Sequence, residues 1–333
     1  MLRSRCLTLA IFLVLTSSVS ASLAAGKGHK TYTDPSQAGE SFAVQGEYAG
    51  LVSDPDDGDV KYGAQVIALG GGKYRMVAFR GGLPGAGWDK SDKIIMEGEM
   101  ADGAVTFEVP DQPAEVTIKN GVATVSESYG NDLGTLKKVN RKSPTMGVKP
   151  PKGAVVLFDG STAEHFKKGR IVEDKLLAQG VISKQAFDGH KLHMEFRTPY
   201  MPTARGQARG NSGLYVQGRY EVQILDSFGL KGETNECGGI YKISVPSVNM
   251  CLPPLSWQTY DIDFTAPKYE AGKKVKNARI TVVQNGVTIH NDIELPSHTA
   301  GGISKEKPAS GPVFLQDHGN PVRFRNIWVV PKK

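Results

Sequence analysis

The stretch that decides the fold is GNSGLYVQGRYEVQILDSFG, residues Gly210–Gly229. It alternates between polar and apolar positions, which is the pattern of half-buried β-strands. In its first part Asn211 and Tyr215 fall on the same face of an extended chain, and in its second part Glu221 and Gln223 do so. The apolar residues between them are expected to face a core. The stretch therefore predicts two strands that carry polar side chains on one face.

The rest of the chain repeats this character. Of 333 residues, 39 are Gly and 19 are Pro, hydrophobic residues make up 39% and charged residues 22%, which indicates a globular chain with many turns. After residue 153 about nine short, mostly alternating runs follow one another, which favours a two-sheet β-sandwich or jelly roll. The fold class expected is all-β.

A second, smaller β domain is expected before the sandwich. Between residues 41 and 139 short strand-like runs are broken by glycine, and Asn120-Gly121 joins two alternating runs, the strongest short signal of a β-hairpin. Residues 140–152 are rich in Pro and Lys without periodicity, which suits a linker. The organisation predicted is a signal peptide over 1–25, a flexible lead over 26–40, an antiparallel β domain over 41–139, the linker over 140–152 and the jelly roll over 153–331.

The amino terminus predicts export. Arg3 and Arg5 precede the apolar run Leu7–Leu15, and small residues follow, as in a secretory signal peptide; an uncleaved anchor is the alternative. The protein is expected to be secreted or periplasmic, with no membrane span after removal of the signal. The net charge of +6 comes from scattered Lys and Arg, so no nucleic-acid partner is expected.

Two cysteines remain after the signal, Cys237 and Cys251, and an even pair in an oxidising compartment predicts a disulfide. Two free buried thiols and half of a metal site are the rival interpretations. Neither cysteine has a second Cys or a His at zinc-ligand spacing.

Other strands extend the polar face seen in the opening stretch. In KLHMEFR, Arg197 alternates with apolar residues, in VFLQDH Gln316 and His318 share a face, and in VRFRNIW Arg323 and Arg325 do. Amide, guanidinium and aromatic side chains of this kind bind sugar rings, so a carbohydrate-binding face is favoured over a plain solvated face.

These motifs, taken in order, resemble a known family. Gly210–Gly229, Cys237–Phe264 and Val313–Val329, with FDGST (Phe158–Thr162) and KLHMEFR, are similar to the 3-keto-disaccharide hydrolase domain, over residues 153–331. The resemblance implies a jelly roll similar to concanavalin A-like lectins and glucanases. Residues 269–277 and 297–310 depart from the family pattern as insert-like stretches.

The resemblance also implies an activity: cleavage of glycosides already oxidised to a ketone at sugar carbon 3. The ketone acidifies the C2 proton, so a base can form an enediolate and the anomeric substituent leaves by elimination, after which water can add. His318 is the candidate base or acid and Glu221 the carboxylate alternative. The remaining roles are the following: Arg197 with Arg323 or Arg325 for the enediolate oxygen, Asn211, Tyr215, Gln223 and Gln316 for hydroxyls, and Asp226 for orienting a partner or capping a turn.

This chain differs from ordinary glucanases of the same fold in the number of carboxylates on one strand. Those glucanases place two or three carboxylates at alternating positions of the strand. Here the strand offers Glu221 and Gln223, which suits proton abstraction by one base better than double displacement. No cofactor is predicted, although a divalent cation is compatible with the face. The expected partner is an oligosaccharide or glycoside; a lectin-like protein without catalysis, and an envelope protein with a vestigial site, are the alternatives.

Overall fold

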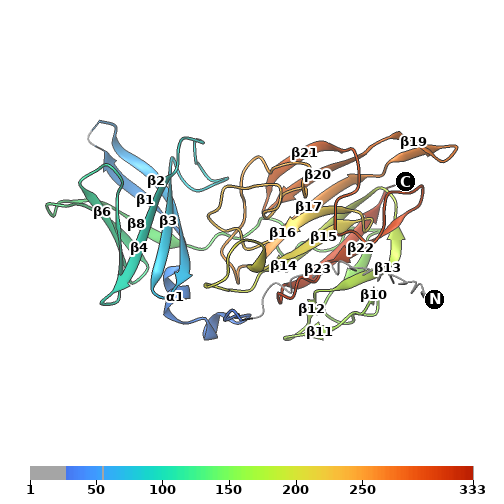
Figure 1. The fold of residues 1–333 in the computed structure, drawn as a ribbon, viewed down its shortest axis with the longest axis horizontal. Helices are drawn as coiled ribbons and strands as arrows, with labels where there is room; N and C mark the ends of the chain where they lie inside the picture. Colours follow the sequence, from blue (N-terminus) through green and yellow to red (C-terminus); the bar gives the residue numbers. More distant parts are fainter. Residues whose placement is uncertain (1–27, 55, 333) are drawn as a thin grey trace, which may run out of the picture.

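The computed structural model describes residues 28–54 and 56–332, in which two β units lie side by side along the long axis of the molecule (Figure 1). The predicted signal peptide lies outside the described residues. The all-β fold class is confirmed, since the helices are confined to α1 (Gly39–Val44) and the 3-10 turns η1 (Pro35–Gln37) and η2 (Gly206–Ala208) in the described chain.

The first unit is a closed eight-stranded barrel. Each strand pairs antiparallel with the next, and β1 pairs with β8 to close the sheet. Asn120 and Gly121 both have positive φ, 52° and 76°, and connect β6 to β7 as a two-residue hairpin. The strands are β1 (Gly46–Asp54), β2 (Gly58–Gly70), β3 (Lys73–Arg80), β4 (Ile94–Ala101), β5 (Ala104–Glu108), β6 (Ala114–Lys119), β7 (Val122–Glu127) and β8 (Asp132–Val139).

The second unit is a sandwich of two sheets. One has five strands in the order β10-β13-β22-β15-β16, and the other has eight, in the order β11-β12-β23-β14-β17-β20-β21 with β9 paired to β23. Two short strands, β18 and β19, form a separate ribbon. The strands are β9 (Val155–Phe158), β10 (Phe166–Lys167), β11 (Ile171–Val172), β12 (Leu176–Ala178), β13 (Val181–Phe187), β14 (His190–Arg197), β15 (Ser212–Val216), β16 (Tyr220–Ile224), β17 (Gln258–Thr265), β18 (Lys268–Glu270), β19 (Lys273–Lys276), β20 (Ala278–Gln284), β21 (Val287–Leu295), β22 (Gly311–Leu315) and β23 (Arg323–Pro331).

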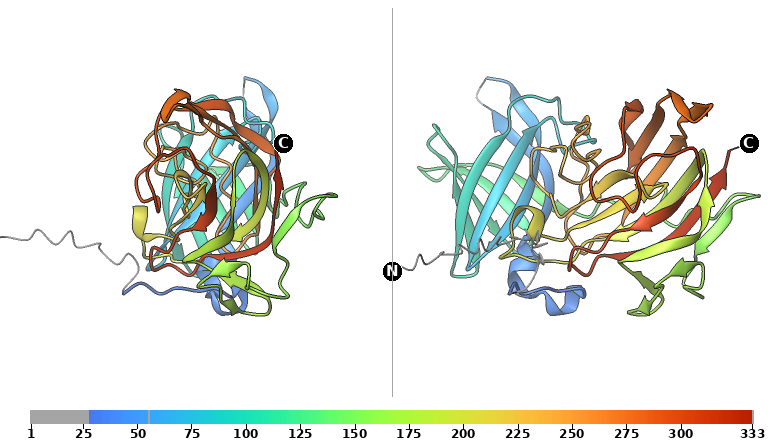
Figure 2. Two further views of the ribbon diagram at one scale, coloured as in Figure 1. Left: turned by 90° about the vertical axis from the view of Figure 1, so that its right-hand side faces the viewer. Right: turned by 45° about the vertical axis from the view of Figure 1, so that its right-hand side comes forward.

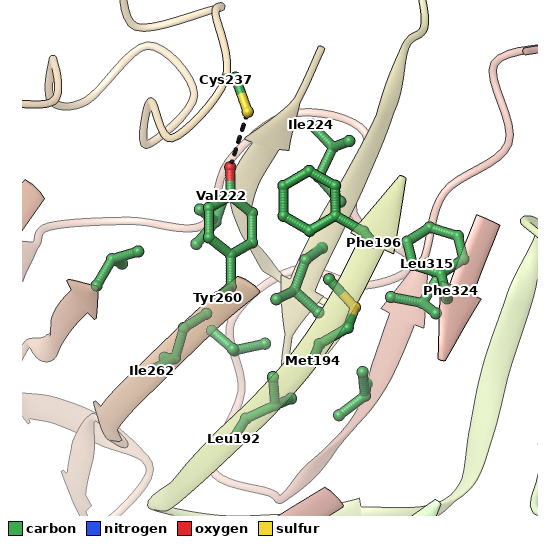
Figure 3. Packing of buried hydrophobic residues seen from close by; sticks show 14 of the residues in the cluster. Leu192, Met194, Phe196, Val222, Ile224, Cys237, Tyr260, Ile262, Leu315 and Phe324 are labelled. Carbon is green, nitrogen blue, oxygen red and sulfur yellow. Dashed lines mark hydrogen bonds between the residues drawn. The ribbon is translucent and has the colours of Figure 1, made fainter. Parts of the chain in front are cut away.

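The apolar side chains of both sheets meet between them. Met194 and Phe196 of β14 face Val222 and Ile224 of β16 across one buried cluster (Figure 3). Because side chains alternate along a strand, the residues between these point away from the core. The polar positions of β14 and of β16 therefore lie on opposite outer surfaces of the sandwich.

The predicted disulfide is not present. Cys237 and Cys251 are both free and buried in the described chain. The Cys237 thiol lies 3.3 Å from the Tyr260 hydroxyl, a contact that is drawn in Figure 3. It also lies 3.3 Å from Nε2 of Gln284. Hydrogen bonding and core packing thus hold this loop, and the interpretation as two free buried thiols is the one the structure supports.

The two units adjoin each other (Figure 2), and side chains of both pack at the junction. Ile67, Val77 and Phe79 point outward from the barrel and join the core cluster of the sandwich. The guanidinium of Arg209 reaches the Ala68 carbonyl of the barrel at 3.4 Å.

The segment before the barrel was predicted to be a flexible lead, and the structure corrects this from residue 28 onward. Tyr32 pairs with Tyr200 through two backbone hydrogen bonds of 3.0 and 2.9 Å, and the Ser41 hydroxyl lies 2.8 Å from the Tyr200 hydroxyl. The rings of Tyr32 and Phe42 also contact the ring of Tyr200, so the segment is held against the folded protein instead of extending into solvent.

Candidate functional site

Polar side chains converge on the outer face of the five-stranded sheet. β15 lies between β22 and β16, so Tyr215 is directly opposite Glu221, and Gly213 is directly opposite Gln223. The backbone N–H of Gln316, just past β22, donates to the Gly213 carbonyl at 2.9 Å. Residues about a hundred positions apart in the chain are thereby brought side by side.

Gly213 makes this convergence possible. A Cβ at this position would lie 2.3 Å from Oε1 of Glu221 and 3.1 Å from Oε1 of Gln316. Any side chain here would displace the carboxyl group, so the glycine opens the space in which Glu221 and Gln316 meet.

Glu221 is the most perturbed carboxyl group on this face. Its exposed fraction is 3%, and burial raises its pKa to about 8, against a smaller opposite effect of the Tyr215 hydrogen bond. At neutral pH this side chain is mostly a neutral carboxylic acid, which can donate a proton.

Tyr215 connects the carboxyl group to a neighbouring loop. Its hydroxyl donates to the Ala300 carbonyl at 3.0 Å and accepts from Nε2 of Gln316 at 3.2 Å. Burial raises its pKa above the ordinary range, so it remains a phenol. The loop after β21 is fixed here as well, because the Thr299 hydroxyl accepts the Glu221 backbone N–H at 2.9 Å.

Four amide side chains continue the polar face beside the carboxyl group, those of Gln207, Asn211, Gln223 and Gln316. Nε2 of Gln223 donates to Oε1 of Gln207 at 3.3 Å, and Nδ2 of Asn211 donates to the same atom at 3.2 Å. Oδ1 of Asn211 and Oε1 of Gln316 are buried and have no hydrogen-bond partner within residues 28–54 and 56–332. Both atoms can accept a hydrogen bond from a ligand hydroxyl.

His318 lies in the loop after β22, two residues past Gln316, and is partly exposed. Burial lowers its pKa, with Asp317 acting in the opposite direction. Its imidazole is therefore neutral at pH 7 and able to accept a proton. Its proton-transfer role stays a prediction.

Asp226 has a place at the junction of the two units. Its Oδ2 accepts a hydrogen bond of 2.6 Å from Nε of Arg209, and both side chains are buried. Since Arg209 also reaches the barrel, this ion pair supports the packing between units, and a substrate contact by Asp226 stays a prediction.

The three predicted arginines do not share this face, and that prediction is wrong. Arg197 lies on β14 and Arg323 and Arg325 on β23, with their side chains on the outer surface of the eight-stranded sheet. Arg323 and Arg197 bind Glu173 there, at 2.6 and 3.3 Å. The reason is that β14 and β16 belong to opposite sheets. Alternation along a strand shows which residues share a face, but it does not show which sheet the strand joins.

The outer surface of the eight-stranded sheet carries a charged cluster of its own. Nδ1 of His193 lies 2.6 Å from Asp261, and Nε of Arg325 donates to Glu195 at 2.6 Å. The linker covers this cluster, because Gly147 N–H donates to Glu195 at 2.6 Å. His193 and Glu195 are almost fully buried beneath it, so the cluster holds the linker to the sheet.

Two contributors to the candidate site on the five-stranded sheet were not predicted from the sequence. Gln207 lies in η2, and Ala300 lies in the stretch 297–310 that departs from the family pattern. Neither has a local signal, because each reaches the site through a loop.

Two further observations concern the described residues. They contain no group of three or more His, Cys, Asp or Glu side chains arranged to hold a metal ion. None of their helices is long and apolar enough to cross a membrane.

The two-sheet sandwich with this polar face defines a class, that of jelly-roll domains. Residues 153–330, more than half of the chain, match the 3-keto-alpha-glucoside-1,2-lyase-like domain family, and the chain belongs to that family. This confirms the family resemblance inferred from the motifs.

One solved structure agrees with this assignment. A proposed glycosyl hydrolase from Parabacteroides distasonis is 36% identical, over 55% of this chain and 85% of that one, with a TM-score of 0.50. A second such protein from the same organism is 18% identical, over 55% of this chain and 95% of that one, with a TM-score of 0.40. No curated protein was found to match the chain.

Proposed function

We propose that the protein is an exported enzyme that cleaves 3-keto glycosides on the outer face of the five-stranded sheet. The observation that carries the proposal is the buried Glu221, whose pKa is raised to about 8, beside Tyr215 and Gln316. Family membership supports the substrate class, and the predicted signal peptide supports export.

The two titratable groups suit opposite tasks. The neutral His318 removes the C2 proton, which the C3 ketone has acidified, and an enediolate forms. Glu221, as a carboxylic acid, protonates the anomeric oxygen while the bond from C1 to that oxygen breaks. The sugar product is an unsaturated ketone, to which water can add at C1. Environments that move the pKa values of an acid and a base in these directions are typical of such pairs.

Amide side chains replace the arginines in the earlier prediction. Gln223 and Gln316 are the donors available on this face for the oxygen that becomes negative at C3, and the unpaired acceptor atoms of Asn211 and Gln316 suit sugar hydroxyls. A neutral donor set fits an oxyanion whose charge exists only during the reaction.

The test is product analysis with a 3-keto disaccharide and with its unoxidised parent, each with and without a chelator. The proposal expects release of the second sugar from the keto compound alone. A bell-shaped dependence of kcat/KM on pH is expected, with its alkaline limb near the pKa of Glu221, about 8, and its acidic limb below the ordinary pKa of His318, 6.5. Binding without turnover indicates a lectin, and neither binding nor turnover indicates a structural envelope protein.

Site variants sharpen this test. Glu221→Gln and His318→Gln should each abolish turnover without unfolding the protein, whereas His165→Gln, at an exposed position, should keep full activity. Full activity in both site variants removes them as acid and base.

A further inference from the structure

The barrel contains a cavity that the glycoside site does not use. It has a volume of ≈ 130 Å³ and is lined mainly by apolar side chains, among them Ala64, Met76, Val116 and Leu136. An eight-stranded barrel is just wide enough either to be filled by its own side chains or to hold one small ligand. The identity of the inward-facing residues decides between the two.

Small residues leave this barrel hollow. Ala64 of β2 and Ala78 of β3 are direct cross-strand partners, so one wall lacks bulk over two neighbouring strands. Ala114 of β6 and Ala123 of β7 line the same cavity from other strands. A filled core alternates large and small residues across facing positions, whereas here alanines from four strands line the cavity.

The two ends of the cavity differ. At the end near α1, Tyr48, Tyr74 and Phe107 are fully buried and close the lumen, and Tyr200 of the sandwich packs with them. At the other end, Val52 of β1 and Ile94 of β4 are only partly buried. The cavity is thus a blind pocket with one mouth.

Polar groups surround this mouth. Ser53, Asp54 and Gln112 contribute to the lining, and the Tyr62 hydroxyl lies 3.5 Å from Nη1 of Arg80. A ligand with an apolar body and one hydroxyl would place the body among the alanines and the hydroxyl at this rim. For comparison, an apolar cavity of about 150 Å³ in another protein stays dry and binds benzene.

We propose that the barrel lumen is a binding site for a small monocyclic phenol. The volume accommodates one aromatic ring, the closed end excludes longer chains, and the rim supplies partners for the hydroxyl. This site is separate from the glycoside face, since its lining residues all belong to the barrel. The two proposals can therefore fail independently.

The experiment uses the full chain and p-cresol, with cyclohexanol and glucose as comparison ligands. Isothermal titration and saturation-transfer NMR measure binding, and intermolecular NOEs are sought between the p-cresol ring and the methyl groups of Val116 and Leu136. Saturable p-cresol binding with these NOEs, and no binding of glucose, supports the proposal. Absence of p-cresol binding at concentrations on the order of 10 mM overturns it.

Cavity-filling variants provide the matched control. Ala123→Leu and the milder Ala78→Val should weaken p-cresol binding at least tenfold, whereas Ala101→Leu, at an exposed position of β4, should leave it unchanged. Circular dichroism establishes that each variant is folded, and if Ala123→Leu is not, Ala78→Val decides. Unchanged binding in a folded filling variant, or NOEs to other methyl groups, overturns the proposal.

Discussion

Replacing Glu221 by Gln should stabilise the folded protein at alkaline pH while it removes activity. Burial raises the pKa of this carboxyl group from its ordinary value of 4.5 to about 8. The folded state therefore retains a proton that the unfolded chain releases. The stability that this proton contributes is fully present below pH 4.5 and is lost as the pH rises through about 8. The amide of Gln does not ionise and escapes the penalty.

The magnitude follows from the shift of the pKa. One unit corresponds to about 1.4 kcal/mol, so the penalty on the wild-type protein is about 3 kcal/mol at pH 7 and approaches about 5 kcal/mol above pH 8. These are upper values, since water reaching the site in brief openings reduces them. The stability of the variant relative to the wild type should thus increase as the pH rises. Below pH 4.5 the variant should gain no stability from this effect.

Urea unfolding of both proteins between pH 4 and pH 9 measures this difference. The control is Glu115→Gln, the same replacement at an exposed position of β6, which should follow the wild type at every pH. The refuting result is a difference in the free energy of unfolding between Glu221→Gln and the wild type that stays constant across this pH range, to within about 0.5 kcal/mol. The carboxyl group is then not held neutral by burial, and the acid role assigned to it is refuted.

Three further variants test the geometry. Gly213→Ala should lower kcat/KM by about 100-fold, because its methyl group displaces the Glu221 carboxyl. Steady-state kinetics with a 3-keto disaccharide measure this, and a wild-type value of kcat/KM contradicts the convergence of Glu221 and Gln316 at Gly213. Arg197→Gln should keep kcat/KM within about twofold of the wild type, because Arg197 lies on the opposite sheet. A large loss of kcat/KM in the same assay places Arg197 in the candidate site. Arg209→Met should destabilise the protein by about 3–5 kcal/mol in urea unfolding, because Asp226 is left buried without its partner; a loss below about 1 kcal/mol shows that the ion pair does not support the junction.

Local sequence patterns predicted the elements well where the signal is short-range. Asn120-Gly121 predicted a two-residue hairpin, and the backbone of both residues has the positive φ that this turn requires. Alternation along Gly210–Gly229 predicted that Glu221 and Gln223 share an outward face, and the apolar Val222 does pack in the core. Closure of the first domain was not predictable in this way, because the pairing of β1 with β8 joins residues far apart in the chain.

Alternation failed where a strand is irregular. It predicts that Asn326 faces the same side as Phe324 and that Ile327 lies opposite. In the structure Asn326 has a positive φ of 45° at an irregularity of β23, so Ile327 is buried with Phe324 and the Asn326 amide donates to Glu195 instead. One extra residue in a strand moves every later side chain to the opposite face of the sheet. No residue type in this strand signals the irregularity at Asn326.

The sequence by itself determined the all-β class, the family and the residues of β15 and β16 that face the candidate site, because each depends on the order of nearby residues. Only the tertiary structure decided which sheet each strand joins. That assignment depends on pairing between distant strands, and it placed Glu221 on one outer surface and Arg197 on the other. The same long-range packing raised the pKa of Glu221, since burial is a property of the assembled sandwich and not of any single strand.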